Sequence, residues 1–461
     1  MDLPALAFAR QLARLAPQEL LDRLHAIRAL GTVRGLRFLD DHSRPRTIDV
    51  AAMPWILTPA QVALFHRVAR TMASALVRLP AIYRRNAAVR RILPMDEVQE
   101  SWIRLEPPLR GVSGVIGRLD AAVHFESPGW RDGFQLLEPN AVGVGGVHYA
   151  PTACSVILDV FGDLLERAVP GRRVVPMPDP RKMLVDEAAQ VARQLGIRLR
   201  GLALIENMDY TTGTDEFEQL ARYVRQQGLA AVVADPRQLA RSGRGFTARG
   251  VPVDLFYRDC ELNEFIEMEA GGRRLTALRQ AIRQGRLISR LAWEFDHKSC
   301  WEIFTDPTLS RMFTPAQRRL FRSHLPWTRL VRDAKVSDPA GRCVELLAYI
   351  RRRKDALVLK PNTLYGGQGV AVGHCVSRAD WERTLAKALR GPTHYVVQQL
   401  ASIGLERFPV LNHARPQRLE LRAVSGFFFS STQVGLVGRF SRDPVVNVSR
   451  GGGLLSALMI Q

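Results

Sequence analysis

The segment between residues 199 and 259 alternates buried-strand patterns with a helical pattern. The runs LRGLALIE, AAVVADP and VDLFYRD each predict a strand, and FEQLARYVRQQG between the first two predicts a helix. Two strands separated by one helix pair in parallel, because the chain must cross over to begin the second strand at the same end as the first. This segment therefore predicts a separate parallel α/β unit within residues 172–260.

The rest of the chain divides into helical and strand-rich stretches. Residues 1–90 show helical spacing of apolar residues around a turn-like PWILT, and Thr58 followed by Pro59 predicts a helix start. Residues 262–330 are again helical in pattern, and the chain is strand-rich from Ala356 to its end. A length of 461 residues predicts two or three packed units and excludes a single small binding module.

The composition restricts the class of protein. Hydrophobic residues make up 46% of the chain and charged residues 24%, as in a globular protein with a sizeable core. The net charge is +20, but only six of the 65 basic residues are lysines and the arginines spread along the whole chain, so we expect no specific nucleic-acid partner. No apolar run has the ~18 residues of a membrane helix and no leader pattern follows Met1, which predicts a cytoplasmic protein without a membrane partner. The five cysteines stand singly, which predicts free thiols.

A polar cluster is expected on a hairpin. Strands near 115–125 and 134–140 flank a turn rich in glycine and proline. Glu138 and Asn140 lie two residues apart and face the same side, and the paired strand can place Asp120 beside them. Two carboxylates and an amide carbonyl suit a hard cation such as Mg²⁺, shared with phosphate oxygens. The alternative is a strand-end polar cluster that binds no metal.

A lysine and a glycine-rich loop follow each other in ALVLKPNTLYGGQGVAVG. An apolar strand delivers Lys360, and Gly366, Gly367 and Gly369 lead into the next strand. Glycines let backbone N–H groups approach a phosphate chain, and a lysine adds a localised positive charge. The loop differs from a Walker P-loop, because its glycines follow the lysine and no helical pattern follows the glycines. The alternative is a plain glycine hairpin.

Two further motifs are weak by themselves. The strand HYVVQQL ends in Gln398, Gln399 and Leu400, where a strand edge can offer backbone hydrogen bonds to a purine, although a core strand has the same pattern. Arg422 and Arg439 lie in predicted strands of a meander, where guanidinium groups suit bidentate contacts with oxyanions. Any single arginine of this arginine-rich chain can equally be a surface cation.

Together the four motifs resemble the ATP-grasp superfamily of carboxylate-activating ligases. A strand-Lys-Pro with a glycine loop, a V-V-Q-Q-L hinge strand and an L-L-E-x-N strand are nucleotide-site elements of that superfamily. Ordinary members carry the metal strands after the lysine loop, whereas Asn140 precedes Lys360 by 220 residues here. This order resembles the circularly permuted ATP-grasp proteins, such as glutathionylspermidine synthase. Their R-x-D and L-L-E-x-N motifs map onto Arg118 with Asp120 and onto Glu138 with Asn140.

The resemblance covers roughly residues 90–461 and implies an α/β (α+β) fold with the permuted ATP-grasp element order. The implied division is a helical region at 1–90, an ATP-grasp part with the metal hairpin at 91–171, an inserted pre-ATP-grasp-like α/β domain at 172–300, and an ATP-grasp part with the lysine loop and adenine hinge at 301–461.

The resemblance also implies an activity. A ligase of this kind uses ATP and Mg²⁺ to join a small-molecule or peptide carboxylate to an amine through an acylphosphate, and it releases ADP and phosphate. Implied roles are metal binding for Asp120, Glu138 and Asn140; phosphate binding for Lys360, Lys335, Gly366, Gly367 and Gly369; adenine binding for Gln398, Gln399 and Leu400; and action on the acylphosphate for Arg439, with Arg422 second.

Two departures from the family pattern affect the substrate contacts. Residues 141–146 read AVGVGG where the family often has Ala-Asp-Thr-Pro-Thr, and the hinge has Gln398-Gln399 where Gln-Glu is common. No amidase-like domain fits within the first 90 residues. The main alternative is a non-catalytic ATP-grasp-like protein that binds a nucleotide or peptide, and the third is a nucleic-acid-binding protein driven by the net charge. Lys298 is either structural or a substrate contact, and the oligomeric state stays open.

Overall fold

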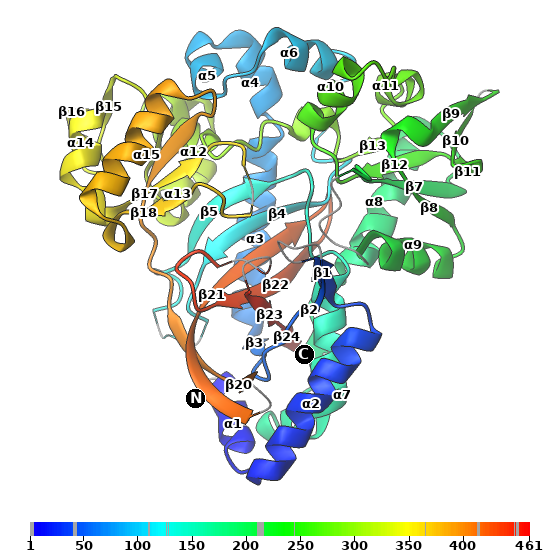
Figure 1. Ribbon diagram of the computed structural model, residues 1–461, viewed down its shortest axis with the longest axis vertical. Helices are drawn as coiled ribbons and strands as arrows, with labels where there is room; N and C mark the ends of the chain where they lie inside the picture. The colour runs from blue at the N-terminus through cyan, green and yellow to red at the C-terminus, as the bar shows by residue number, and fades with distance from the viewer. Residues whose placement is uncertain are drawn as a thin grey trace.

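The computed structural model has an α+β fold, as predicted, in which two lobes flank a central sheet (Figure 1). It describes residues 4–39, 44–108, 111–125, 127, 129–209, 216–243, 245–364, 366–412, 415–446, 448 and 451–461, without the side chains of 410–412, 415 and 416. None of the described helices is long and apolar enough to cross a membrane.

The central sheet has six strands and contains the predicted hairpin. Its order is β23-β22-β21-β4-β5, and β20 pairs with the far part of β21. The bounds are β4 Gly117–Ala122, β5 Gln135–Asn140, β20 Leu405–Asn412, β21 Arg415–Phe429, β22 Val434–Ser441 and β23 Gly453–Leu455. All its pairings are antiparallel. Because β21 pairs with β4, segments far apart in the sequence lie side by side.

A second antiparallel sheet carries the lysine strand and forms the lobe at the left of Figure 1. Its order is β14-β19-β17-β18, with β14 Thr328–Leu330, β17 Leu357–Pro361, β18 Ala371–Val372 and β19 Tyr395–Gln399. Helices α14 (Leu346–Arg352) and α15 (Arg378–Arg390) and the hairpin β15–β16 (Lys335–Ser337, Cys343–Glu345) complete the lobe. Its separate hydrophobic core, which includes Trp381 and Tyr395, makes this lobe a distinct packing unit.

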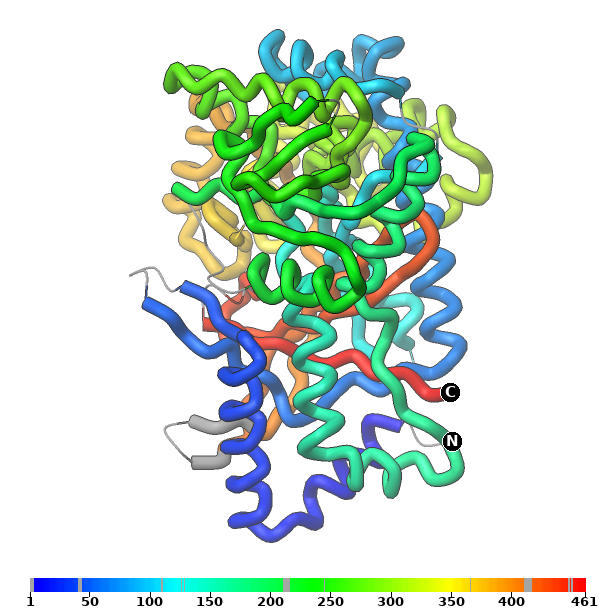
Figure 2. The backbone as a smooth tube through the Cα atoms, turned by 90° about the vertical axis from the view of Figure 1, so that its right-hand side faces the viewer, coloured from blue at the N-terminus to red at the C-terminus, as the bar shows by residue number. Residues whose placement is uncertain are grey.

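The predicted parallel unit forms the opposite lobe (Figures 1 and 2). Its sheet has the order β13-β12-β7-β8, with every pairing parallel: β7 Gly201–Ile205, β8 Ala230–Ala234, β12 Leu255–Arg258 and β13 Leu287–Ile288. Helix α9 (Glu216–Gln226) makes the crossover that the sequence predicted. The remaining elements of this lobe are α8 (Pro180–Leu195), α10 (Leu262–Ala270), α11 (Thr276–Arg283) and a small sheet of β9 Leu239–Ser242, β10 Gly245–Ala248 and β11 Val251–Val253.

The expectation of a turn at PWILT was wrong. Residues Trp55–Leu57 form strand β3, which pairs in parallel with β24 (Ala457–Ile460), and β24 also pairs with β6 (Val174–Pro176). Trp55 is buried, and its indole N–H donates to Glu406. The three-residue apolar run has no strand partner nearby in the sequence, so its local pattern could not reveal the pairing.

Helices cover the central sheet and its lower end. The N-terminal region contains α1 Pro4–Leu12, α2 Pro17–Val33, the hairpin β1–β2 (Arg37–Leu39, Pro45–Thr47), α3 Pro59–Leu76, α4 Leu79–Arg85, α5 Ala87–Ile92 and α6 Glu97–Ile103. Helix α7 (Tyr149–Ala168) runs beside α1 and α2, and α12 (Cys300–Thr305) and α13 (Pro315–His324) pack near α5 and α3. The phenyl ring of Phe65 on α3 lies 4.8 Å from that of Phe427 on β21, so α3 covers one face of this sheet.

The predicted start of α3 is confirmed. The Thr58 hydroxyl accepts from Gln61 N–H, the Gln61 side chain accepts from Thr58 N–H, and Pro59 is the first helical residue. Such reciprocal capping satisfies two backbone donors that the helix itself leaves unpaired.

Replacing this cap should destabilise the protein measurably. We expect Thr58→Ala to lower the free energy of unfolding by about 1 kcal/mol, because it removes the acceptor for Gln61 N–H. Urea unfolding monitored by circular dichroism measures the change. Thr58→Ser keeps the hydroxyl and serves as the control; equal loss in both variants would contradict a capping role.

Candidate active site

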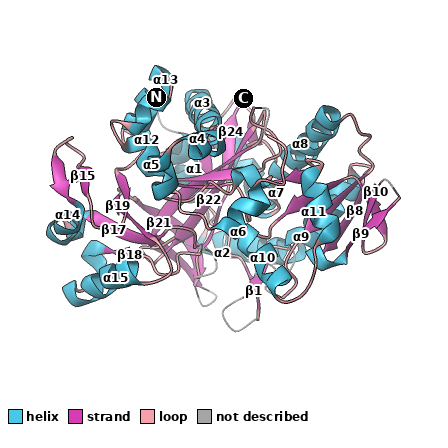
Figure 3. Cartoon of the chain, turned by 90° about the horizontal axis from the view of Figure 1, so that it is seen from above, coloured by secondary structure: helices cyan, strands magenta, loops and turns pink. Residues whose placement is uncertain are grey.

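A cavity of about 1120 Å³ opens between the two antiparallel sheets and the parallel unit. Figure 3 shows the sheet with β17 and β19 on one side of the central strands β21 and β22, and the parallel unit with β8 on the other side. The cavity is lined by β4 and β5, by β17 and the loop after it, by β21 and β22, and by the ends of β7 and β12. Residues more than 200 positions apart in the chain therefore meet in one space.

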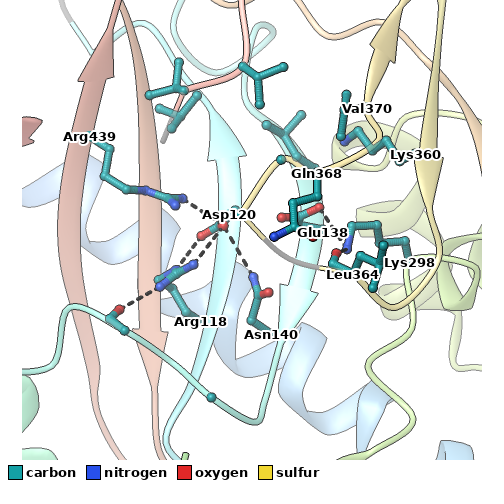
Figure 4. Close-up of a pocket in the computed structure, with 18 of the residues that line it drawn as sticks. Arg118, Asp120, Glu138, Asn140, Lys298, Lys360, Leu364, Gln368, Val370 and Arg439 are labelled. Carbon is teal, nitrogen blue, oxygen red and sulfur yellow. Dashed lines mark hydrogen bonds and ion pairs between the residues drawn. The ribbon is translucent and has the colours of Figure 1, made fainter. Parts of the chain in front are cut away.

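The hairpin register places the three expected metal ligands together. Asp120 on β4 is directly opposite Glu138 on β5, and Arg118 is opposite Asn140. All four side chains line the cavity (Figure 4). The period of two along β5 therefore gives the shared face that the sequence analysis expected.

Asp120 is held by two guanidinium groups. Its carboxylate accepts from Arg118 at 2.6 and 3.1 Å, lies 2.8 Å from Arg439, and accepts from the Asn140 amide at 3.3 Å. Burial alone would raise the pKa of Asp120, but Arg118 and Arg439 outweigh this effect and hold its pKa below the ordinary range. Asp120 is therefore an anion at neutral pH.

The donor set fits a hard cation in its chemistry. Glu138 and the Asn140 carbonyl offer oxygen ligands beside Asp120, whose own oxygens are engaged by arginines. Within the described part of the chain, no group of three or more Asp, Glu, His or Cys side chains can hold a metal alone. Mg²⁺ commonly combines one or two carboxylates with phosphate oxygens and water. A metal here would thus depend on a phosphate ligand.

Lys360 reaches the hairpin through a buried glutamine. The Gln398 carbonyl accepts from Lys360 Nζ at 2.9 Å, and the Gln398 amide donates to Leu137 O at 3.1 Å and to Thr328 Oγ1 at 3.0 Å. Burial lowers the pKa of Lys360, and the nearby Glu138 opposes that effect. The glutamine side chain thus joins the lysine strand to the predicted metal hairpin.

Lys298 lies in the same site, although its role could not be decided from the sequence. Its ammonium donates to Leu364 O at 2.8 Å and lies 3.6 Å from the Glu138 carboxylate. Its backbone N–H donates to Asn362 O, two residues beyond Lys360. The loop that follows the lysine strand therefore fixes a second lysine beside Glu138 (Figure 4).

The structure brings in some predicted residues and leaves others outside. Gly366, Gly367, Leu400, Arg422 and Arg439 line the cavity, in addition to the groups described above. Gly366 and Gly367 have φ values of 69° and 72°, which a residue with a Cβ rarely adopts. Residue 365 of the glycine loop lies outside the described residues.

Lys335, Gln399 and Gly369 do not line the cavity. Lys335 lies on the β15–β16 hairpin, where its side chain is 71% exposed and 3.4 Å from Glu345. The Gln399 side chain is exposed at the end of β19. A Cβ on Gly369 would lie 2.9 Å from Pro361, so this glycine serves close packing.

The far end of the cavity is acidic, a feature that the sequence analysis missed. Glu206 follows β7 and Asp259 follows β12, and these strands are adjacent and parallel with Ile205 opposite Arg258. Ligands of parallel sheets bind at the carboxyl ends of the strands, so this rule could have identified both residues. Further carboxylates at this end are Glu216, Glu261, Glu264, Glu294 and Asp296.

Burial and repulsion between neighbouring carboxylates raise the pKa values of four of these acids. Burial is the main cause in each case and raises the pKa of Glu261 to about 8, of Asp296 to about 7, of Glu206 to about 7 and of Asp259 to about 6. Glu206, Asp259 and Glu261 have no ion-pair partner among the residues that the structure describes. This end of the cavity therefore suits a cation.

The AVGVGG segment is held by two of these acids. Asp296 accepts from Ala141 N–H at 2.5 Å, and Glu216 accepts from Gly146 N–H at 2.8 Å and from His148 N–H at 2.9 Å. Arg118 donates to Gly145 O at 2.7 Å from the other side. The segment thus contributes backbone groups, in place of the polar side chains common in the resembling family, and connects the basic and acidic ends.

Comparison with known proteins supports the fold. No protein-family model matches the chain, and no curated protein matches it by sequence. A glutathione synthetase-like effector from Globodera pallida, solved in its apo form, aligns with a TM-score of 0.59 and 12% identity over 96% of this chain and 98% of that one. The two proteins therefore share a fold along nearly their whole lengths.

The acidic end makes the unliganded protein pH-sensitive. We expect the free energy of unfolding to fall from pH 6 to pH 8, because the folded state keeps protons on Glu206, Glu261 and Asp296 that the unfolded chain has lost near pH 4 to 5. The folded state binds more protons in this range, so stability is lost as the pH rises through the folded pKa values of about 7 and 8. Urea unfolding at three pH values measures the slope.

Glu261→Gln should flatten this slope, whereas Glu166→Gln on the exposed side of α7 should leave it unchanged. Stability that increases between pH 6 and pH 8 in the wild-type protein would contradict the assignment.

Proposed function

We propose that the chain is an ATP-dependent carboxylate–amine ligase of the circularly permuted ATP-grasp type. The observation that carries the proposal is the Gln398 bridge, which joins the lysine strand of one antiparallel sheet to the hairpin of another. Lys360 thereby shares one cavity with Glu138 and Asp120, although it lies on a different sheet from the two acids. A nucleotide held between two antiparallel sheets is the arrangement that the ATP-grasp resemblance implies, and the order of hairpin before lysine strand supports permutation.

The basic end is assigned to the triphosphate. Lys360 and Lys298 supply positive charge, and the N–H groups of Gly366 and Gly367 lie in the loop that lines the same region. Lys298 takes the role expected for Lys335. Mg²⁺ on Glu138 and Asn140, with Asp120 beside them, would neutralise charge on the phosphates. Phosphoryl transfer needs this neutralisation and alignment more than a protein nucleophile.

Arg439 and Arg422 are assigned to the acylphosphate. A carboxylate oxygen of the substrate attacks the γ-phosphorus, the bond to the β,γ-bridging oxygen breaks, and ADP leaves. Arg439 has its Nε buried without a partner among the described residues, so a donor remains for an oxyanion. Arg422 donates to Arg442 O and faces the same cavity. Guanidinium groups suit the bidentate contacts that a phosphate offers.

The acidic end is assigned to the amine. An amine is protonated in water and must lose a proton before its lone pair attacks the acyl carbon and expels phosphate. Carboxylates attract the ammonium form, and a group with a pKa near 7, such as Glu206, is matched to accept that proton at neutral pH. The cavity thus separates an anionic substrate from a cationic one.

Substitution of the lysines tests the phosphate assignment. Methionine keeps most of the apolar stem, so Lys360→Met and Lys298→Met should each weaken binding of Mg²⁺–ATP about ten- to a hundredfold, as expected for a charge-assisted contact of about 1.5–3 kcal/mol. Titration calorimetry measures the affinity. Lys335→Met is the matched control and should bind ATP normally; a loss at Lys335 equal to that at Lys360 would refute the assignment.

The cleavage products test the reaction class. With a suitable carboxylate, attack at the γ-phosphorus should yield ADP and phosphate, and slow hydrolysis of the acylphosphate should release them even without the amine. Chromatography of nucleotides after long incubation with pooled carboxylates and amines measures this, with Glu138→Gln as the blank. AMP and pyrophosphate would refute the ATP-grasp mechanism, and ATP binding without consumption would favour the non-catalytic alternative.

A further inference from the structure

Two stretches of the sequence contain many arginines and no acidic residue. Between Asp49 and Asp96 the chain has seven arginines and no aspartate, glutamate or lysine. Between Asp306 and Asp333 it has six arginines and again no acidic residue. The first stretch contains helices α3, α4 and α5, and the second contains α13. Positive charge is therefore concentrated in these helices.

The structure places the two stretches side by side. The Arg78 guanidinium donates to Met312 O at 2.8 Å and stacks on Phe313, and the Gln317 amide donates to Ser74 Oγ at 3.0 Å. Helix α13 packs against α3, and α12 packs against α5. Figure 3 shows α3, α4, α5, α12 and α13 grouped along one side of the molecule. The two acid-free stretches thus form one continuous surface.

This surface lies across the central sheet from the cavity. Helix α3 contacts Phe427 on β21, whereas Arg422 and Val424 of the same strand line the cavity. Odd- and even-numbered residues of a strand face opposite sides of the sheet. A ligand on the helices would therefore not compete with a ligand in the cavity.

Among the described residues, the exposed arginines of this surface form no ion pairs. We define the arginine face as Arg67, Arg84, Arg85, Arg91, Arg319 and Arg322, all exposed. None of these six has a carboxylate within ion-pair distance in the described part of the chain. Exposed arginines elsewhere are of two kinds: some pair with an acidic side chain, as Arg351, Arg383 and Arg407 do, and others have no acidic partner in the described chain, so the face is distinguished by the clustering of its unpaired arginines in stretches without acids. None of these six positive charges is therefore neutralised by an ion pair among the residues that the structure describes.

We propose that the arginine face binds nucleic acid through its phosphate backbone, without sequence preference. Guanidinium groups form bidentate contacts with phosphate oxygens, and neutralised phosphates release counterions, which favours binding entropically. A membrane partner fits less well, since none of the exposed large apolar side chains of the described chain lies on α3, α4, α5 or α13. The proposal is independent of the ligase assignment.

Fluorescence anisotropy with a labelled 24-base-pair DNA duplex and a labelled 24-nucleotide RNA of mixed sequence tests the proposal on the full-length chain. Binding at low salt should weaken steeply as salt rises, with a slope of log affinity against log salt of about −0.9 per contacted phosphate for the duplex and about −0.7 for the single strand. The two probes show whether duplex or single-stranded backbone is preferred.

Charge reversal locates the surface. The variant with Arg84, Arg85, Arg319 and Arg322 changed to Glu should lose at least about tenfold in affinity and show a shallower salt slope. The control changes four exposed arginines elsewhere, Arg193, Arg353, Arg378 and Arg390, to Glu and so has the same net charge. Circular dichroism melting and Mg²⁺–ATP affinity report the fold of each variant, and the two pairs of substitutions are made separately if the fourfold variant unfolds.

Three results would overturn the proposal. Equal losses in the two variants would show that net charge, and not this face, drives binding. Binding of anionic phospholipid vesicles without binding of either nucleic acid would assign the face to a membrane. Absence of salt-dependent binding to both probes at about 50 mM salt would exclude a phosphate-backbone site.

Discussion

A single buried glutamine joins the parts of the candidate site. Gln398 is 1% exposed, and its amide accepts from a lysine of its own sheet while donating to the hairpin of the central sheet. A buried amide that lost one of these partners would incur the full cost of an unsatisfied polar group, about 1–3 kcal/mol. The position of Lys360 relative to Glu138, and hence the shape of the basic end, depends on this bridge.

One end of the cavity is basic and the other is acidic. At each end, the charged side chains outnumber the side chains of opposite charge that could pair with them. The lysines and arginines around Glu138 and Asp120 exceed their carboxylate partners, whereas Glu206, Asp259 and Glu261 lack cations. Burial, and to a lesser extent repulsion between neighbouring carboxylates, raises the pKa values of Glu206 and Glu261, so these acids keep their protons to unusually high pH. Ligands of opposite charge would relieve the repulsion at each end. Part of the binding free energy can therefore come from removing repulsion that is present in the unliganded protein.

The sequence was most informative where the chemistry depends on local spacing. The period of two along β5 correctly placed Glu138 and Asn140 on one face, and the Thr58 cap could be identified from its immediate neighbours. The features that could not be predicted from the sequence depend on contacts between segments far apart in the chain. Lys298 lies in the site because its backbone N–H donates to Asn362 O. Lys335 lies outside the site because it is on the exposed β15–β16 hairpin. Residues Trp55–Leu57 form a strand because β24 pairs with them. Glu206 and Asp259 could be identified as residues at the carboxyl ends of predicted parallel strands, but their position next to each other depends on the strand order, which the sequence pattern does not determine.

The pairing of β4 with β21 has a consequence for how the chain reaches its native state. Ser425 donates to Ala121 O across 304 residues of sequence. At a synthesis rate of about 5–20 residues per second, the hairpin with Asp120 waits roughly 15 to 60 s for the strand that completes its sheet. During that interval one edge of β4 offers unpaired backbone groups to other chains. Protection of this edge, by a chaperone or by transient contacts of the N-terminal helices, is therefore a requirement of folding that is separate from the stability of the finished fold.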